Sequence, residues 1–325
     1  MTVAAQRAMT AREWALLALL SLLWGGSYLF VGVSVREIPP LTVVTLRVGL
    51  AAAILWACAP ILGVALPRSA KAIAALAVLG FGNNAVPFAL IAWAQTHLPG
   101  GLASILTAST PLFSLLAGHV LTKEEKLSAL KLSGAVAGMV GVASLVGPDL
   151  LTGAGANLWA ELAVLGAALS YALSAIFARR MGSLGLKPID VVAGQSIAAT
   201  LILAPLALVI DRPWTLPVPS DAAIASILAI AAFSTALAFI VYFRILAGAG
   251  ATNVLLVTLL VPVTAVLLGA LFLDERLLIR QFFGFALIAI GLAFIDGRLP
   301  RALFARNNPN LPPRNSRLPI HQKSR

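Results

Sequence analysis

Charged residues are scarce in this sequence, and their scarcity already limits the class of protein. Asp, Glu, Lys and Arg make up 11% of the chain, against about 25% in soluble domains. Hydrophobic residues make up 60%, and the mean hydropathy is +0.97. They come in runs of about 20, the length that crosses the hydrocarbon of a bilayer, rather than as amphipathic stripes. The composition therefore excludes a pair of soluble domains and predicts a chain that lies mostly in lipid.

Cysteine and catalytic motifs are equally scarce. The one cysteine, Cys58, lies inside an apolar run, which excludes a disulfide within the chain, a thiolate metal site and a redox motif. The three histidines are dispersed, and the sequence has no His-Glu-x-x-His, no Gly-x-Ser-x-Gly and no paired aspartates in mid-run. An intramembrane enzyme needs such a nucleophile, base or metal cluster. We therefore expect no enzymatic activity, no metal and no cofactor.

What the sequence does contain is ten apolar segments that are long enough, or nearly so, to cross a membrane. The first follows Arg7 and Arg12 but lacks a small-x-small cleavage pattern, so a retained helix is predicted rather than a signal peptide. The links are short, so successive helices should be antiparallel neighbours in an all-α integral membrane protein. The predicted transmembrane helices are 14–35, 41–64, 72–94, 98–121, 129–147, 157–178, 188–210, 221–243, 248–272 and 279–296.

The net charge of +11 comes from basic residues in the links and in the tail, not from a stripe that could follow phosphates. With Arg47 set aside inside a predicted helix, eighteen Lys and Arg fall on the side of the N-terminus and four on the other side. Basic residues favour the cytoplasm, so both termini are predicted to be cytoplasmic and nucleic acid is not an expected partner. Residues 297–325 are predicted to form a basic, disordered cytoplasmic tail within reach of anionic lipids.

The second half of the sequence repeats the first at a nearly constant offset. Pro40-Leu-Thr-Val-Val-Thr-Leu-Arg47 returns as Pro188-Ile-Asp-Val-Val-Ala-Gly-Gln195, and the set Trp24, Ser27 and Phe30 returns as Tyr171, Ser174 and Phe177. Each half holds an odd number of segments, so the second copy must enter the membrane in the opposite orientation. The sequence thus predicts two inverted five-helix repeats, at 14–147 and 157–296.

Further motifs follow one another in order along the two halves: Trp24-Gly25-Gly26-Ser27, Arg47, Pro111, Glu125-Lys126-Leu127, Gly134, Ser234 to Phe239, Pro262 and Glu275-Arg276-Leu277. In the order and duplication of these motifs, the sequence resembles the ten-helix EamA-type branch of the drug/metabolite transporter superfamily. The resemblance covers about residues 14–296, and it implies an inner-membrane carrier, often an exporter of amino acids or related metabolites. It implies a small-molecule substrate without naming one, membrane lipids as neighbours, and leaves a homodimer open.

Three alternatives to a carrier stay open from the residues alone: an intramembrane enzyme, a channel and a structural membrane subunit. A channel would need a ring of like charges or a filter of carbonyls, and the sequence has neither pattern. The coupling of a carrier also stays open. Glu161, Asp296 and His119 lie near the ends of apolar runs, where an interfacial role is expected ahead of a proton relay.

Arg47 is the one basic side chain placed well inside a predicted helix. A charge in hydrocarbon costs a few kcal/mol unless it is paired or reaches the interface. Arg47 is therefore predicted either to snorkel, capping carbonyls or a lipid phosphate, or to contact an anionic group of the substrate. Its repeat counterpart, Gln195, keeps the polarity but not the charge.

Aromatic and hydroxyl side chains share helix faces at corresponding places in the two halves. Trp24, Ser27 and Tyr28 are spaced i, i+3 and i+4, and Tyr171 and Ser174 repeat the spacing. Such faces suit a small amphipathic solute, although packing between helices would use the same residue types. We expect them to line one central cavity, together with uncharged polar residues on other helices: Asn84, Ser104, Thr107, Thr235 and Asn253. Gly134, Gly138, Gly141, Gly284 and Gly291 are predicted to be packing faces.

Overall fold

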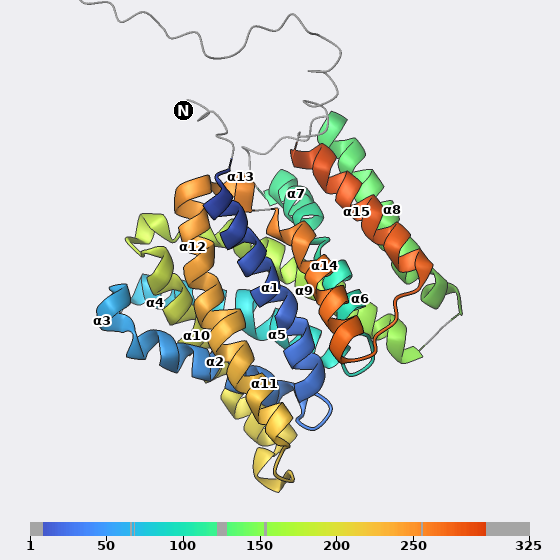
Figure 1. Ribbon diagram of the computed structural model, residues 1–325. Helices are drawn as coiled ribbons and strands as arrows, with labels where there is room; N and C mark the ends of the chain where they lie inside the picture. Colours follow the sequence, from blue (N-terminus) through green and yellow to red (C-terminus); the bar gives the residue numbers. More distant parts are fainter. Residues whose placement is uncertain are drawn as a thin grey trace, which may run out of the picture.

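The computed structural model describes residues 9–65, 67, 69–121, 129–152, 155–254 and 256–296. The predicted tail at 297–325 lies outside this part of the chain. All the regular elements of the described residues are helices (Figure 1). They are α1 (Ala11–Ser34), α2 (Pro40–Ala57), α3 (Ala59–Leu62), α4 (Ala70–Leu79), η1 (Gly80–Ala85), α5 (Val86–Ala94), α6 (Gly100–Thr107), α7 (Thr110–Leu121), α8 (Ala129–Thr152), α9 (Gly155–Ala178), η2 (Gly182–Leu184), α10 (Pro188–Leu206), η3 (Ala207–Asp211), η4 (Pro213–Thr215), α11 (Asp221–Ala231), η5 (Ala232–Leu237), α12 (Ala238–Ala249), α13 (Ala251–Val254), α14 (Val257–Phe272) and α15 (Ile279–Asp296).

Seven helical stretches of the described residues are long and apolar enough to cross a membrane. The other three predicted segments contain shorter apolar helices, at Lys131–Leu145, Val257–Phe272 and Ile279–Phe294. Large hydrophobic side chains such as Leu201 and Phe283 lie on the surface, 70% and 68% exposed. A surface of this kind fits lipid rather than water. The protein is therefore a multi-pass membrane protein, while the count of ten crossings stays a prediction.

Several predicted helix ends were wrong by a few residues. The segment predicted at 221–243 continues to Ala249, and the next begins at Ala251 rather than at 248. Gly250, whose φ is 81°, separates them, because only glycine adopts this backbone conformation freely. The segment predicted at 129–147 runs on to Thr152 as α8. Pro111 coincides with a break between α6 and α7, where the hydroxyl of Thr110 donates to the carbonyl of Thr107 over 2.7 Å.

Hydrogen bonds between the connections show the direction of the helices. We call the end of the bundle at which α1 begins the proximal face, and the end at which α1 finishes the distal face. At the distal face, Glu37 follows α1 and accepts from the N–H of Ser220, 2.7 Å away, at the start of α11. At the proximal face, Asp190 at the start of α10 accepts from the N–H of Ala65, 2.8 Å away. The helix α1 therefore ends at the distal face, whereas its repeat counterpart α9 ends at the proximal face.

The packing of the helices follows the repeat. The helix α1 packs against α14, α11 and α12. Its counterpart α9 packs against the corresponding helices of the first half, which are α6 and α7, α4, and α5. The two self-corresponding pairs, α2 with α10 and α8 with α15, also pack together. Figure 1 shows α8 and α15 side by side at the edge of the bundle. The two halves are thus related by an approximate two-fold arrangement.

Glycines allow α8 and α15 to approach closely, as predicted. A Cβ added at Gly141 would lie 2.8 Å from the carbonyl oxygen of Gly284, and one at Gly291 would lie 2.5 Å from the carbonyl oxygen of Gly134. Close backbone approach of this kind is typical of helix pairs in membranes. The pair contributes no residue to the cavity described next, so its role in the fold is structural.

Candidate functional site

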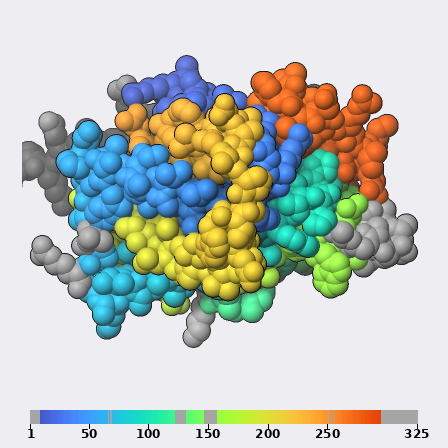
Figure 2. All heavy atoms as spheres, turned by 90° about the horizontal axis from the view of Figure 1, so that it is seen from below, coloured from blue at the N-terminus to red at the C-terminus, as the bar shows by residue number. Residues whose placement is uncertain are grey.

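A cavity of about 810 Å³ lies in the centre of the bundle. Its walls come from both halves and include residues of α1, α2, α5, α6, α9, α10, α12 and α14. The lining continues to Arg179 and Gly182, in the connection between α9 and α10, so the cavity extends to the proximal face. No residue of the distal connections that the structure describes belongs to this lining. The lining therefore gives the cavity no opening at the distal face in this conformation. Figure 2, a view of that face, shows yellow segments around the start of α11 packed against the blue helices.

The structure brings most of the predicted site residues to this cavity. Two helix faces predicted from the repeat, that of Trp24 and Ser27 on α1 and that of Tyr171 and Ser174 on α9, line the same space. The predicted residues on the cavity wall are Trp24, Ser27, Tyr28, Arg47, Ser104, Thr107, Tyr171 and Ser174. Their contact with a substrate stays a prediction.

Three predicted residues do not lie on the cavity wall: Asn84, Thr235 and Asn253. Neighbours on a helix point in directions about 100° apart, and at two of these positions the adjacent residue faces the cavity instead. Asn83 and Ser234 take those places, and Asn84 and Thr235 are fully buried behind them. The side-chain amide of Asn253 donates to the carbonyl of Ala249 over 2.9 Å.

Arg47 turns into the protein, so the prediction that it snorkels to a lipid phosphate was wrong. Its side chain is 8% exposed, and its Nε donates to the hydroxyl of Thr235 over 3.1 Å. Its Cζ lies 3.8 Å from the centroid of the Phe88 ring, a cation–π contact. Among the described residues, no carboxylate pairs with this guanidinium. A buried cation held by neutral groups leaves its charge available to an anionic group in the cavity.

An aromatic cluster forms the apolar part of the cavity wall nearer the proximal face. The ring of Trp24 lies 6.3 Å from that of Phe239 and 5.7 Å from that of Tyr242, centroid to centroid. Phe243 stacks on Phe239 at 6.4 Å. No binding role was predicted from the sequence for Phe239, Tyr242 and Phe243. Their i, i+3 and i+4 spacing on α12 is nevertheless the same signal as that of Trp24, Ser27 and Tyr28.

Three further polar residues of the wall were not among the predicted site residues: Asn83, Gln195 and Ser234. The amide of Asn83 donates to Oε1 of Gln195 over 3.3 Å, and both line the cavity. Asn83 lies in η1 and Ser234 in η5, two π-helical turns at corresponding places in the two halves. Such turns often occur at functional sites because they displace backbone and side chains locally. No cluster of His, Cys, Asp and Glu suited to a metal occurs in the part of the chain that the structure describes.

The sequence also matches the model of a known family twice. The EamA-like transporter family matches residues 12–147 and again residues 158–296. The chain belongs to this family. Its members are named as transporters, and the duplicated match agrees with the two halves seen in the packing of the helices.

Individual EamA relatives are similar over most of their length. The "Probable amino-acid metabolite efflux pump" of Escherichia coli strain K12 is 28% identical over 297 residues, which cover 87% of this chain and 94% of that protein. The uncharacterized transporter YoaV of Bacillus subtilis strain 168 is 25% identical over 279 residues, 84% of this chain and 92% of that one. A solved crystal structure shares the fold, with a TM-score of 0.63 and 20% identity over 88% of this chain and 98% of that chain.

Proposed function

We propose that this EamA protein is a secondary transporter that exports small amphipathic metabolites, amino acids or their derivatives, across the inner membrane by alternating access. The central cavity is the observation that carries the proposal. It lies between two halves that run in opposite directions, and a carrier of this architecture holds its solute at such an interface. Its wall offers one buried cation, several hydroxyls and amides, and an aromatic cluster.

The wall suggests how the solute is oriented. A carboxylate would accept from the guanidinium of Arg47, whose fork of donors matches two carboxylate oxygens. The apolar side chain would then contact the rings of Trp24 and Phe239. Ser27 and Ser174 would donate to the polar end. A neutral amino acid with an apolar side chain, for example L-phenylalanine, has all three features.

A polyanionic solute fits this wall poorly. Nucleotides and sugar phosphates need several Arg or Lys around their phosphates. Arg47 is the buried basic residue of the lining, and Arg179 lies at the proximal end of the cavity. We therefore expect amino acids to be transported in preference to nucleotides.

In the proposed topology the chain crosses the membrane ten times as two inverted five-helix repeats. Both termini and the proximal face lie in the cytoplasm. Reporter fusions after Leu127 and after Leu277 test it, because these residues occupy corresponding places in the two halves. We expect the two reporters on opposite sides of the membrane. Two reporters in the same compartment would show that the repeats are not inverted.

Reconstitution into liposomes tests the transport function. The purified chain should exchange external labelled L-phenylalanine for unlabelled L-phenylalanine loaded inside, and the initial rate should saturate. Saturable counterflow identifies a carrier and excludes a pore. Uptake that never saturates, or faster exchange of a nucleotide than of any amino acid in the same panel, would refute the proposal.

A further inference from the structure

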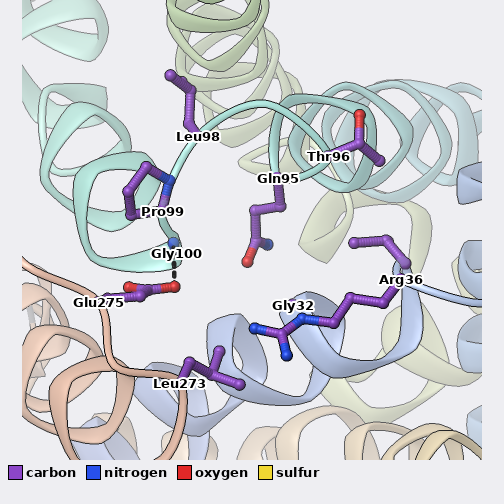
Figure 3. Close-up of a pocket in the computed structure, with 10 residues that line it drawn as sticks. Gly32, Arg36, Gln95, Thr96, Leu98, Pro99, Gly100, Leu273 and Glu275 are labelled. Carbon is purple, nitrogen blue, oxygen red and sulfur yellow. Dashed lines mark hydrogen bonds between the residues drawn. The ribbon is translucent and has the colours of Figure 1, made fainter.

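A second, smaller cavity of about 320 Å³ lies at the distal face, and we call it the distal pocket. Figure 3 shows its walls: Gly32 on α1 and Arg36 just after it, Gln95 from the connection before α6, Gly100 at the start of α6, and Glu275 from the connection before α15. It shares no lining residue with the central cavity. The pocket has room for several waters or for one small solute.

Gln95 presents an unsatisfied amide to the distal pocket. The side chain is 9% exposed, and neither its Nε2 nor its Oε1 has a hydrogen-bond partner. Figure 3 shows the amide pointing into the pocket between Gly100 and Gly32. Buried amides are nearly always hydrogen-bonded, and one without a partner costs stability. A bound molecule with both a donor and an acceptor would satisfy it.

Opposite charges stand on either side of this amide. The guanidinium of Arg36 points into the pocket on one side (Figure 3). On the other side, the carboxylate of Glu275 accepts from the N–H of Gly100 over 2.8 Å and from that of Gly101 over 3.0 Å. A carboxylate can accept about four hydrogen bonds, so Glu275 keeps capacity for another donor. The pocket thus offers a cation for a carboxylate, an anion for an ammonium, and an amide that bonds to either.

Only one layer of residues separates the distal pocket from the central cavity. On α1, Gly32 lines the pocket and Tyr28, one turn earlier, lines the cavity. On α6, Gly100 lines the pocket and Ser104, one turn later, lines the cavity. A turn rises about 5.4 Å. The layer itself is the contact of Gly100 with Tyr28, where an added Cβ would lie 3.3 Å from the Tyr28 Cβ.

We propose that the distal pocket is a second binding site for a zwitterionic α-amino acid, which the solute occupies after it passes the Tyr28 layer. The solute carboxylate binds Arg36, its ammonium binds Glu275, and Gln95 bonds to both ends. This inference rests on the proposed function, since it takes the solute of the central cavity to be an amino acid. It goes beyond that function by adding a binding site between the Tyr28 layer and the distal face.

Equilibrium binding of labelled L-phenylalanine to the purified full-length protein in nanodiscs tests the number of sites. The wild-type chain should bind two molecules, and Arg36→Gln and Gln95→Leu should each bind one, with the remaining affinity unchanged. Arg212→Gln is the matched control, because Arg212 is also exposed at the distal face but does not line the pocket. It should still bind two.

A thiol in the pocket locates the second molecule. Thr96 lines the distal pocket, and Cys58 is the only natural cysteine, so Thr96→Cys in a Cys58→Ser chain carries a single reporter. L-Phenylalanine should slow the reaction of this introduced thiol with a small maleimide, and adding Arg36→Gln should abolish that protection.

The outcomes of these two experiments separate the inference from the proposed function. One bound molecule in the wild type, no protection of the introduced thiol and normal counterflow would together mean that the pocket holds water only. That result overturns this inference and leaves the proposed function intact. Loss of both binding and counterflow in the wild type would refute the two together.

Discussion

The guanidinium of Arg47 is held by the hydroxyl of Thr235, and these two residues belong to opposite halves of the chain. The same hydroxyl donates to the carbonyl of Ile230 over 3.0 Å, across the π-helical turn η5. A single hydroxyl therefore ties the buried cation to a local distortion of the other repeat. The position of the charge in the cavity depends on both.

Replacing Arg47 with Gln should weaken the transport of amino acids that carry a free carboxylate. A hydrogen bond to a charged group contributes about 1.5–3 kcal/mol, which corresponds to about a 10- to 150-fold rise in the concentration needed for half-maximal counterflow of L-phenylalanine. Inhibition by phenylalaninol, which lacks the carboxylate, should not change. Thr235→Val should have a smaller effect in the same direction. Thr45→Val is the control, since Thr45 lies on α2 and donates to the carbonyl of Leu41 instead. Equal effects on both compounds would contradict a carboxylate contact.

Replacing Ser27 or Ser174 with Ala should impair transport while folding and membrane insertion stay normal. Each change removes one hydroxyl from the cavity wall with little loss of volume, and a lost hydrogen bond costs about 0.5–1.5 kcal/mol. Initial counterflow rates and the melting temperature of the purified variants give the two readouts. Ser144→Ala on α8 is the control, because its hydroxyl donates to the carbonyl of Gly141 away from the cavity. Wild-type counterflow rates in both variants would show that these serines pack between helices and do not bind the solute.

Trp24→Leu should raise the half-saturating concentration of L-phenylalanine by about 2- to 10-fold, since an aromatic pair contributes about 0.5–1.5 kcal/mol beyond the area it buries. The effect on L-alanine, which has no ring, should be smaller. Trp159→Leu offers a matched control, because Trp159 is 65% exposed and does not line the cavity. The same shift for both amino acids would show that Trp24 shapes the cavity without stacking on the solute.

Gly141→Ala should destabilise the protein through the pair α8 and α15. The new methyl group would meet backbone of α15 at 2.8 Å, and overpacking of this kind costs about 1–3 kcal/mol. Thermal unfolding in detergent measures the loss. Gly166→Ala is the control, because its Cβ would make an ordinary contact at 3.7 Å with Leu90. A melting temperature of Gly141→Ala at or above that of Gly166→Ala would contradict the close packing.

Glu37→Gln should lower stability at neutral pH but not in acid. The hydroxyl and the N–H of Ser220 both donate to the Glu37 carboxylate and hold its pKa below the ordinary value, which is about 4.3. A carboxylate whose pKa is lowered by folding stabilises the folded state at any pH above its ordinary pKa. This stabilisation disappears as the pH falls through the lowered pKa of the folded state. The difference in melting temperature between wild type and variant should therefore shrink below about pH 4.3. A difference in melting temperature that grows in acid would contradict a lowered pKa of Glu37.

The helical segments could be predicted from the sequence because a bilayer requires apolar runs of about 20 residues. The duplicated motifs could be recognised because each one occurs in both halves. The sequence placed Trp24, Ser27, Tyr171 and Ser174 on one cavity for the same reason. It could not choose between Asn83 and Asn84, since a π-helical turn changes which neighbour faces inward. Nor could it show that Arg47 turns away from lipid, because that depends on Thr235 and Phe88, which only the folded chain brings near.

The single layer at Tyr28 also has an electrical consequence. Water in the central cavity and in the distal pocket would carry the potential of each compartment inward, so that most of the membrane voltage would fall across the one turn between Tyr28 and Gly32 on α1. Moving one elementary charge across the full membrane voltage changes its free energy by about 2.3 kcal/mol per 100 mV. A zwitterion crosses this short distance with no net charge, so its passage would be insensitive to the membrane potential, whereas any ion that moved with it would feel nearly the whole field within a few ångströms.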